Sequence, residues 1–167
     1  MHVDEAIRSR RTLKDYSDEP VEPEVVAELL DLAALAPNHH LTEPWRFWVV
    51  GRATLETLIE ATGDRKLRRS ATAIVVGVVR DDDPQVAEED YAATACAIQN
   101  LMLAARARGL ASFWRSPAVL PRPEVTQLLD VPDGVRLIGI VHLGRPEGEF
   151  PPPSSERAAA AHTRWLP

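Results

Sequence analysis

The sequence predicts an α+β fold in which a central sheet, mixed or antiparallel, is flanked by helices. Two segments carry this prediction. Residues 72–80 form a nearly continuous β-branched apolar run, typical of a buried strand. Residues 86–108 are rich in alanine and apolar on more than one face, as expected of a helix buried centrally or against a partner subunit. Helices and strands mix without regular βαβ order, which disfavours a parallel α/β sheet.

The remaining elements follow from apolar spacing and from residues that start or end helices. Pro23 suits a first helical turn, Thr54 is placed to cap a helix, and Gly109 is a good residue to end one. Helices are predicted at residues 3–9, 23–36, 54–61, 86–108 and 123–129, and strands at 45–50, 72–80, 110–115 and 136–143. Residues 63–70 are polar and basic, with no clear pattern.

The 167 residues suit a single domain spanning residues 1–167. Its tail, from Gly144 onward, contains three consecutive prolines, an alanine run and a terminal Trp165-Leu166-Pro167. Such a tail has little core to join within a small domain. It fits an arm laid across another subunit, and the alternative is a frayed end.

Composition limits the classes of function. The formal net charge of −6 argues against a general nucleic-acid binder. The longest apolar run, residues 73–79, is too short to span a bilayer, so no membrane partner is expected. A charged helical pattern in place of a secretory segment leads us to expect a cytoplasmic protein. The single cysteine, Cys96, excludes an intrachain disulfide, and we expect it to be a buried structural thiol.

Three segments carry residues suited to ligand binding. In residues 8–14, arginine forks and a hydroxyl match the oxygens of a phosphate, although a solvated basic face is the alternative. In residues 36–45, His39 and His40 are adjacent and do not converge as metal ligands would, so no metal site is predicted. In residues 113–117, Trp114 beside Arg115 suits a planar anionic cofactor, or is a core tryptophan beside a surface arginine.

These segments, taken in order, resemble motifs of the nitroreductase family, in particular its small FMN-dependent members. Residues 6–12 resemble the family's N-terminal helix and its Arg-Arg-Ser phosphate-binding element. Residues 36–47 resemble its Pro-x-His loop and Gln-Pro-Trp-x-Phe strand, and residues 109–116 resemble its Gly-x-x-x-x-Trp-Arg-Ser segment. Residues 141–146 resemble the closing strand and turn.

The resemblance implies a homodimer with two FMN sites at the subunit interface, and the arm expected from the tail would then cross to the partner. The FMN-binding residues it implies are Arg10, Arg11, Thr12, His39, Trp114, Arg115 and Ser116. The first three are expected on the phosphate and ribityl chain, and the histidine is expected to reach the flavin across the interface. The last three are expected along the isoalloxazine ring, while Arg145 and Arg157 are weaker candidates for the phosphate.

Three positions depart from the family pattern. Thr12 replaces the usual Ser and keeps the hydroxyl. Glu43 replaces the usual Gln and adds negative charge, and Leu35 stands where small members can have a basic flavin contact. These departures bear on the substrate and on the choice between NADH and NADPH.

The implied activity is that of an FMN oxidoreductase. NADH or NADPH passes a hydride to flavin N5 and leaves, and a small organic acceptor such as a nitroaromatic or quinone then takes the site. No catalytic side chain is expected, because the cofactor supplies the chemistry. The residues also allow an FMN-binding carrier or sensor without turnover, or a helical interaction module whose basic cluster meets an acidic partner.

Overall fold

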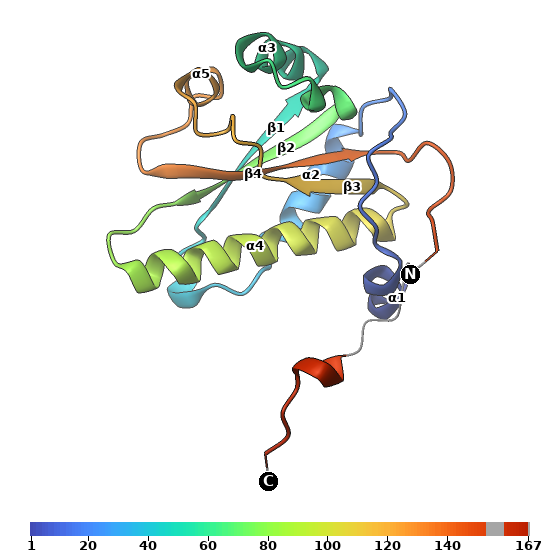
Figure 1. Cartoon of the computed structure of the whole chain (residues 1–167), viewed down its shortest axis with the longest axis vertical. Helices are drawn as coiled ribbons and strands as arrows, with labels where there is room; N and C mark the ends of the chain where they lie inside the picture. Colours follow the sequence, from blue (N-terminus) through green and yellow to red (C-terminus); the bar gives the residue numbers. More distant parts are fainter. Residues whose placement is uncertain (153–158, 167) are drawn as a thin grey trace.

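The computed structural model describes residues 1–152 and 159–166, and it has a four-stranded antiparallel sheet at its centre (Figure 1). The strands lie in the order β1-β2-β4-β3, so β1 and β3 form the two edges of the sheet. Their bounds are β1 (Trp45–Gly51), β2 (Thr72–Val79), β3 (Ala111–Arg115) and β4 (Val135–Gly144). The predicted α+β class is confirmed, and of the two sheet types expected the sheet is the antiparallel one.

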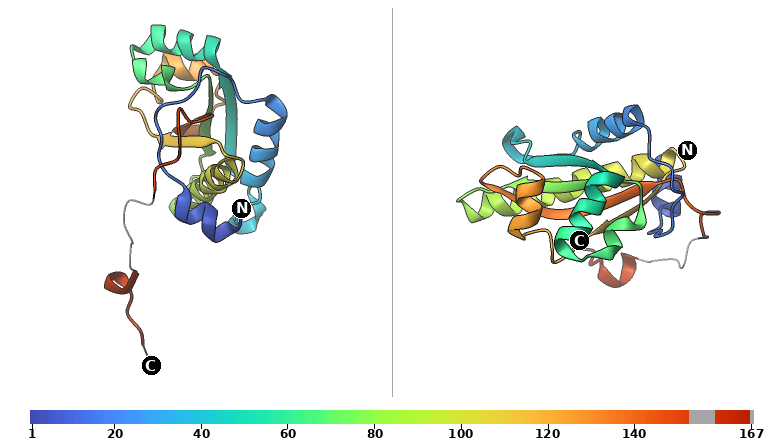
Figure 2. Two further views of the ribbon diagram at one scale, coloured as in Figure 1. Left: turned by 90° about the vertical axis from the view of Figure 1, so that its right-hand side faces the viewer. Right: turned by 90° about the horizontal axis from the view of Figure 1, so that it is seen from above.

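Helices cover both faces of this sheet (Figures 1 and 2). The helices α2 and α4 pack on one face, while α3 and α5 pack on the other. The α-helices are α1 (Val3–Ser9), α2 (Pro23–Ala33), α3 (Arg52–Thr62), α4 (Pro84–Ala107) and α5 (Pro123–Leu128). Three short 3-10 turns are η1 (His39–Leu41), η2 (Arg65–Arg69) and η3 (Ala159–His162).

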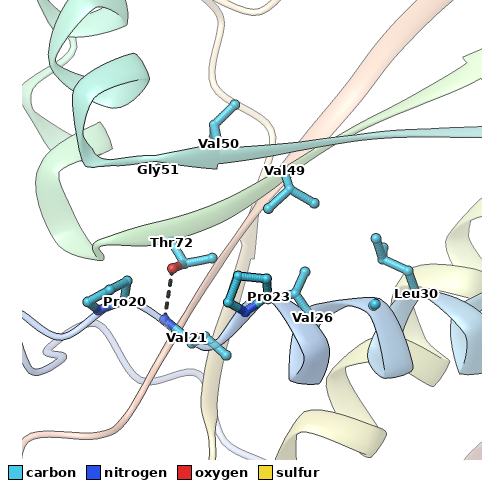
Figure 3. A pocket seen from close by; sticks show the side chains of 10 residues that line it. Pro20, Val21, Pro23, Val26, Leu30, Val49, Val50, Gly51 and Thr72 are labelled. Carbon is cyan, nitrogen blue, oxygen red and sulfur yellow. Dashed lines mark hydrogen bonds between the residues drawn. The ribbon is translucent and has the colours of Figure 1, made fainter.

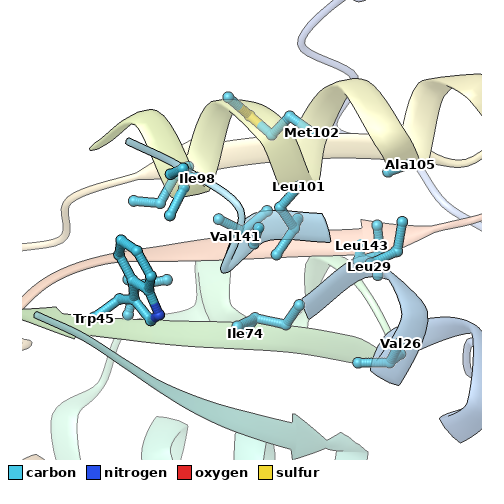
Figure 4. Packing of buried hydrophobic residues seen from close by; sticks show 14 of the residues in the cluster. Val26, Leu29, Trp45, Ile74, Ile98, Leu101, Met102, Ala105, Val141 and Leu143 are labelled. Carbon is cyan, nitrogen blue, oxygen red and sulfur yellow. The ribbon is translucent and has the colours of Figure 1, made fainter. Parts of the chain in front are cut away.

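The larger core lies between the sheet and the pair α2 and α4 (Figure 4). Leu29 of α2, Ile74 of β2, Leu101 of α4 and Val141 of β4 meet there, all with no solvent exposure. Burying a side chain of this size contributes about 1.5–3 kcal/mol. This core therefore fixes α4 against the sheet and sets the direction in which its other face points.

The second core lies under α3 and α5. Leu55 of α3, Leu67 of η2, Val125 of α5 and Ile140 of β4 are almost completely buried there. Because η2 contributes Leu67, the basic segment that the sequence left unassigned is held against the sheet.

The ends of α4 are set by local chemistry. Asp83 accepts a hydrogen bond from the backbone N–H of Gln85 at 2.8 Å, which satisfies one of the free donors of the first turn. Gly109 follows the helix with φ of 75°, a left-handed conformation that glycine adopts without steric cost. The predicted end at Gly109 is therefore confirmed.

Two details of the helix predictions are wrong. The helix α3 begins at Arg52, with Gly51 at its N-cap and no side-chain cap bond, so Thr54 does not cap it. Strand β1 passes directly into α3, which leaves no loop for a threonine cap. The helix α2 ends at Ala33, three residues before the predicted Ala36.

The expectation of a buried Cys96 is also wrong, since Cys96 is exposed. The buried positions of α4 include Ala93, Ala97, Leu101 and Ala105, which share one helical face. Cys96 falls on the outward face. In an alanine-rich helix the two faces differ little in composition, so the sequence does not distinguish them.

The segment that follows α1 meets the segment that follows β4 beside strand β3. Residues 10–17 run as an extended stretch past this strand, and Tyr16 forms an antiparallel bridge with Pro146 just after β4. Beyond residue 152 the described part of the tail extends away from the domain (Figure 1). Within the described residues, no helix has the length and hydropathy that a membrane span requires.

Candidate functional site

Four cationic residues lie on or against the segment between α1 and α2, and we call Arg10, Arg11, Lys14 and Arg69 the basic edge. Thr12 holds this segment to the sheet through a parallel bridge with Ser112 of β3. Arg69 of η2 joins the group by donating a hydrogen bond to the backbone carbonyl of Lys14 at 3.4 Å. The Lys14 ammonium lies 5.6 Å from the centre of the Phe113 ring, also on β3. The basic edge is thus built along one edge of the sheet.

The geometry of Arg10 and Arg11 follows from the end of α1. The helix stops at Ser9, and Arg10 takes an extended conformation as its C-cap, φ −60° and ψ 128°. From there the chain leaves the helix and turns toward β3. The Arg11 guanidinium donates to the carbonyl of Arg10 at 2.6 Å, and both arginines are half-buried.

The basic edge has no carboxylate partner in the described part of the chain. Within residues 1–152 and 159–166, no Asp or Glu oxygen lies within 4.0 Å of any of its four cationic groups. The Nε atoms of Arg11 and Arg69 are buried and have no hydrogen-bond partner in that part of the chain. A buried donor without a partner is costly, so these groups suit an anion with several acceptor oxygens, such as a phosphate.

Strand β3 places Trp114 and Arg115 on opposite faces of the sheet, because side chains alternate along a strand. Trp114 packs on the face covered by α2 and α4, and its indole Nε1 is buried without a hydrogen-bond partner among the described residues. Gly139 of β4 makes this position possible: a Cβ there would lie 2.1 Å from Trp114 Nε1. The sequence grouped the two side chains as one contact surface, but the strand separates them.

On the other face, Arg115 forms an ion pair with Asp64, which follows α3. Both side chains are only 14% exposed. Asp64 also accepts the backbone N–H of Lys66 at 3.1 Å, so it both caps η2 and neutralises Arg115. Ser116 donates to the carbonyl of Ile138 at 2.9 Å, which ties the end of β3 to β4.

A buried histidine that the sequence did not single out lies beside this ion pair. His142 of β4 has no exposed surface, and its Nδ1 lies 2.9 Å from Ser70 Oγ. Ser70 donates its own proton to the carbonyl of Thr72, so it accepts from His142 Nδ1–H. Burial, followed by the charges of Arg115 and Arg69, lowers the pKa of His142 to about 4. A lone histidine in an apolar strand gives no sequence signal of such a partner.

His39 lies far from the basic edge within one chain. It contacts Glu89 near the start of α4, whereas α1 packs near the other end of that helix (Figure 1). The sixteen residues from Glu89 to Ala105 cover about 24 Å at the α-helical rise. A single subunit therefore does not bring His39 and Arg10 to one ligand of moderate size.

The two weaker candidates for the phosphate are Arg145 and Arg157. Arg145 is paired with Glu22 at 2.8 Å and with Glu19 at 3.9 Å, so its charge is already balanced. Arg157 lies outside the described residues. No group of three His, Cys, Asp or Glu side chains suited to a metal ion occurs in the described ranges.

An open apolar groove lies apart from the basic edge, between edge strand β1 and the start of α2 (Figure 3). Its volume is about 360 Å³. Val49 of β1, which is 52% exposed, lines one side, and Val26 and Leu30 of α2 line the other. The groove is apolar and sits beside β1, an edge strand of the described sheet, and such edges are surfaces that proteins normally cover.

Comparison with known proteins identifies the family. A sequence model described as "Nitroreductase family" matches residues 7–145. The chain is 32% identical over 160 residues to a Bacillus subtilis protein provisionally named an NAD(P)H nitroreductase, with 84% of this chain and 82% of the relative covered. It is 28% identical over 185 residues to 5,6-dimethylbenzimidazole synthase of Rhodospirillum rubrum, covering 93% of this chain and 87% of that one.

A solved structure has the same fold as this chain. A nitroreductase-like family protein from Bacillus cereus superimposes with a TM-score of 0.86 at 26% identity, covering 99% of this chain and 96% of the other. These matches confirm the resemblance drawn from the motifs: the chain belongs to the nitroreductase family.

Proposed function

We propose that this protein is an FMN-dependent NAD(P)H oxidoreductase that passes reducing equivalents to a small organic acceptor. The observation that carries the proposal is the basic edge, which lacks balancing carboxylates in the described chain and is joined to β3 through Thr12 and Ser112. Relatives named for NAD(P)H nitroreductase activity support the class of reaction. A lone cysteine, with no disulfide to form within the chain, is compatible with a cytoplasmic location, which is part of the proposal.

The residues present fit FMN. Arg10 and Arg11 offer forked donors to a phosphate, and the Arg11 Nε lacks any other partner in the described residues. Thr12 offers a hydroxyl for the ribityl chain. Trp114 of β3 carries an indole N–H without a hydrogen-bond partner among the described residues, while Arg115 and Ser116 are held by Asp64 and the Ile138 carbonyl. We propose that Trp114 borders the isoalloxazine ring, and that Arg115 and Ser116, whose side chains are held by Asp64 and Ile138, fix the end of the strand beside the ring.

Bound FMN would supply the hydride chemistry between the nicotinamide and the acceptor. The tasks left to the chain are to bind the phosphate, to orient the ring and to control access. No side chain is assigned as an acid or base. Nitroaromatics and quinones are suitable test acceptors, and NADH and NADPH are both candidate donors.

We further propose a homodimer in which His39 of one subunit reaches the flavin held by the basic edge of the other. The separation of His39 from Arg10 along α4 supports this arrangement. The outward face of α4 has exposed small residues at Ala92 and Cys96, which allow a close approach of a second chain. For the C-terminal arm, we propose that Trp165 and Leu166, 89% and 74% exposed, occupy the apolar groove of the partner.

A visible spectrum and an FMN titration test the first part of the proposal. The untagged protein should purify yellow or bind added FMN with one site per chain. Stopped-flow mixing with NADH or NADPH then separates an enzyme from a carrier or sensor. Rapid flavin bleaching followed by reoxidation with a quinone supports turnover. A colourless protein that binds no FMN contradicts the proposal, and binding without bleaching leaves only a carrier or sensor.

A further inference from the structure

The loop between α2 and β1 contains unusual backbone strain. We call residues 38–43 the His39 loop. His40 and Leu41 both have φ of 53°, and Glu43 has φ of 44°. Left-handed conformations are disfavoured for residues with a Cβ, and they persist only where surrounding contacts impose them. Three of them within four residues call for specific anchors.

Bonds inside the loop supply part of the restraint. The Asn38 side-chain oxygen accepts the backbone N–H of Glu43 at 3.0 Å, which closes the loop on itself. The rings of His39 and His40 stack with centroids 3.9 Å apart. These contacts hold the loop together but do not fix its position relative to the domain.

Two consecutive residues of α4 attach the loop to the domain. His39 Nδ1 lies 2.5 Å from Glu89 Oε2, and Thr42 Oγ1 donates to Asp90 Oδ1 at 2.7 Å. Asp90 is 4% exposed, so its bond to Thr42 satisfies a buried carboxylate. Gln85, one turn earlier on α4, donates to the second Glu89 oxygen at 3.3 Å and holds that carboxylate in place. Hydrogen bonds from His39 and then Gln85 lower the pKa of Glu89.

The contact with Glu89 also determines which ring nitrogen of His39 is exposed to a ligand. An ionised carboxylate only accepts hydrogen bonds, so the proton lies on Nδ1. The Nε2 atom is then the one that points away from Glu89. The His39 side chain is 57% exposed, so it remains accessible to a second molecule.

We propose that Glu89 and Asp90 are positioning residues, which hold the His39 loop in its strained conformation and fix the ring orientation of His39 for contact with the partner subunit's flavin. The inference rests on the proposed function. Neither carboxylate touches the flavin: both act through the loop, and Glu89 additionally selects the tautomer of His39.

Variants at both anchors test the inference in the full-length protein. Glu89→Ala and Thr42→Val each remove one anchor, and Thr42→Ser restores the hydroxyl. Glu88→Ala is the matched control, because Glu88 is exposed on α4 and makes no side-chain hydrogen bond to another described residue. The readouts are the FMN dissociation constant and the ¹⁵N shifts of the His39 ring, measured without FMN.

Glu89→Ala and Thr42→Val should each weaken FMN binding by about tenfold, while Thr42→Ser and Glu88→Ala stay near wild type. In Glu89→Ala the two ring ¹⁵N shifts of His39 should move toward those of a free, mixed-tautomer imidazole. A melting temperature near that of the wild type shows that a variant is folded. If Glu89→Ala does not fold, the comparison of Thr42→Val with Thr42→Ser tests the inference.

The inference fails if Glu89→Ala leaves the ¹⁵N shifts unchanged, or if both anchor variants bind FMN as tightly as Glu88→Ala. This outcome is distinct from failure of the proposed function, in which the wild-type protein itself binds no FMN.

Discussion

Thr12 pairs with Ser112 in a parallel bridge that lays the segment after α1 along the edge strand β3. Two segments a hundred residues apart in the sequence are joined by this contact. It places the two arginines that precede Thr12 at the same edge of the sheet as the tryptophan that follows Ser112. The bridge thus supports the proposal that both groups bind one cofactor.

The first prediction concerns the phosphate end of that site. Arg10→Ala and Arg11→Ala should each weaken FMN binding by about tenfold or more, because a charge-assisted hydrogen bond contributes about 1.5–3 kcal/mol. Fluorescence titration of apoprotein with FMN measures the effect. Arg80→Ala is the control, since Arg80 is an exposed arginine beyond the far end of β2. Equal affinity in the double variant Arg10→Ala/Arg11→Ala would mean that the basic edge is only a solvated surface.

The second prediction concerns Gly139. In Gly139→Ala the new Cβ would lie 2.1 Å from Trp114 Nε1 and 3.2 Å from the Arg115 carbonyl, so the indole must move. Overpacking of this kind costs about 1–3 kcal/mol, and FMN affinity should fall with the displaced Trp114. Denaturant unfolding and FMN titration measure the two effects. In Gly51→Ala, where no atom lies within 4 Å of the new Cβ, both quantities should change little. A Gly139→Ala variant as stable as Gly51→Ala would contradict the packing argument.

Sequence patterns predicted the helices and strands themselves better than they predicted which elements lie next to one another. The β-branched run at residues 72–80 identifies β2 because an entirely buried strand has no polar alternation. The same pattern does not specify that β4 separates β2 from β3, since strand order depends on long-range packing. The outward position of Cys96 was missed because alanine and cysteine give a helix little amphipathic contrast.

The same limit applies to the candidate site. Arg10, Arg11 and Trp114 were predicted from short motifs, and the Thr12 bridge brings their segments together. Their supporting partners could not be predicted, because Asp64 is 51 residues from Arg115 and Ser70 is 72 residues from His142. Single polar residues at such separations leave no periodic signal. The sequence therefore identifies candidate ligand contacts and omits the residues that hold them.

The third prediction concerns stability at acidic pH. His142 has a pKa of about 4 in the folded state and about 6.5 when unfolded, so the unfolded chain binds more protons between these values. The free energy of unfolding should therefore be highest above pH 6.5 with respect to this group, and it should decrease as the pH falls toward 4. The full difference corresponds to about 3 kcal/mol.

Denaturant titrations of the apoprotein at several pH values check this prediction. In His142→Gln the same carboxylates still titrate, but the contribution of the imidazole is absent. The gap between the wild-type and His142→Gln stabilities should thus narrow or reverse as the pH falls from 6.5 to 4. Two curves that stay parallel over this window would show that His142 is not held neutral by its surroundings.

The last prediction concerns the arm and the groove. The double variant Trp165→Ala/Leu166→Ala removes the two most exposed large apolar side chains of the tail, and Val49→Asp places a charge in the groove. If the arm of one subunit occupies the groove of the other, both variants should weaken the dimer, because each buried large apolar side chain contributes about 1.5–3 kcal/mol. FMN occupancy should fall in parallel, since a cofactor bound between subunits stabilises the dimer by mass action. Light scattering and flavin absorbance on the same dilution series measure both quantities.

His162→Ala, an exposed change in the same tail, should leave the dimer and the FMN occupancy unchanged. A wild-type monomer that keeps its full flavin complement would overturn the dimer and the shared site, and unchanged dimers in both variants would overturn the docking of the arm alone.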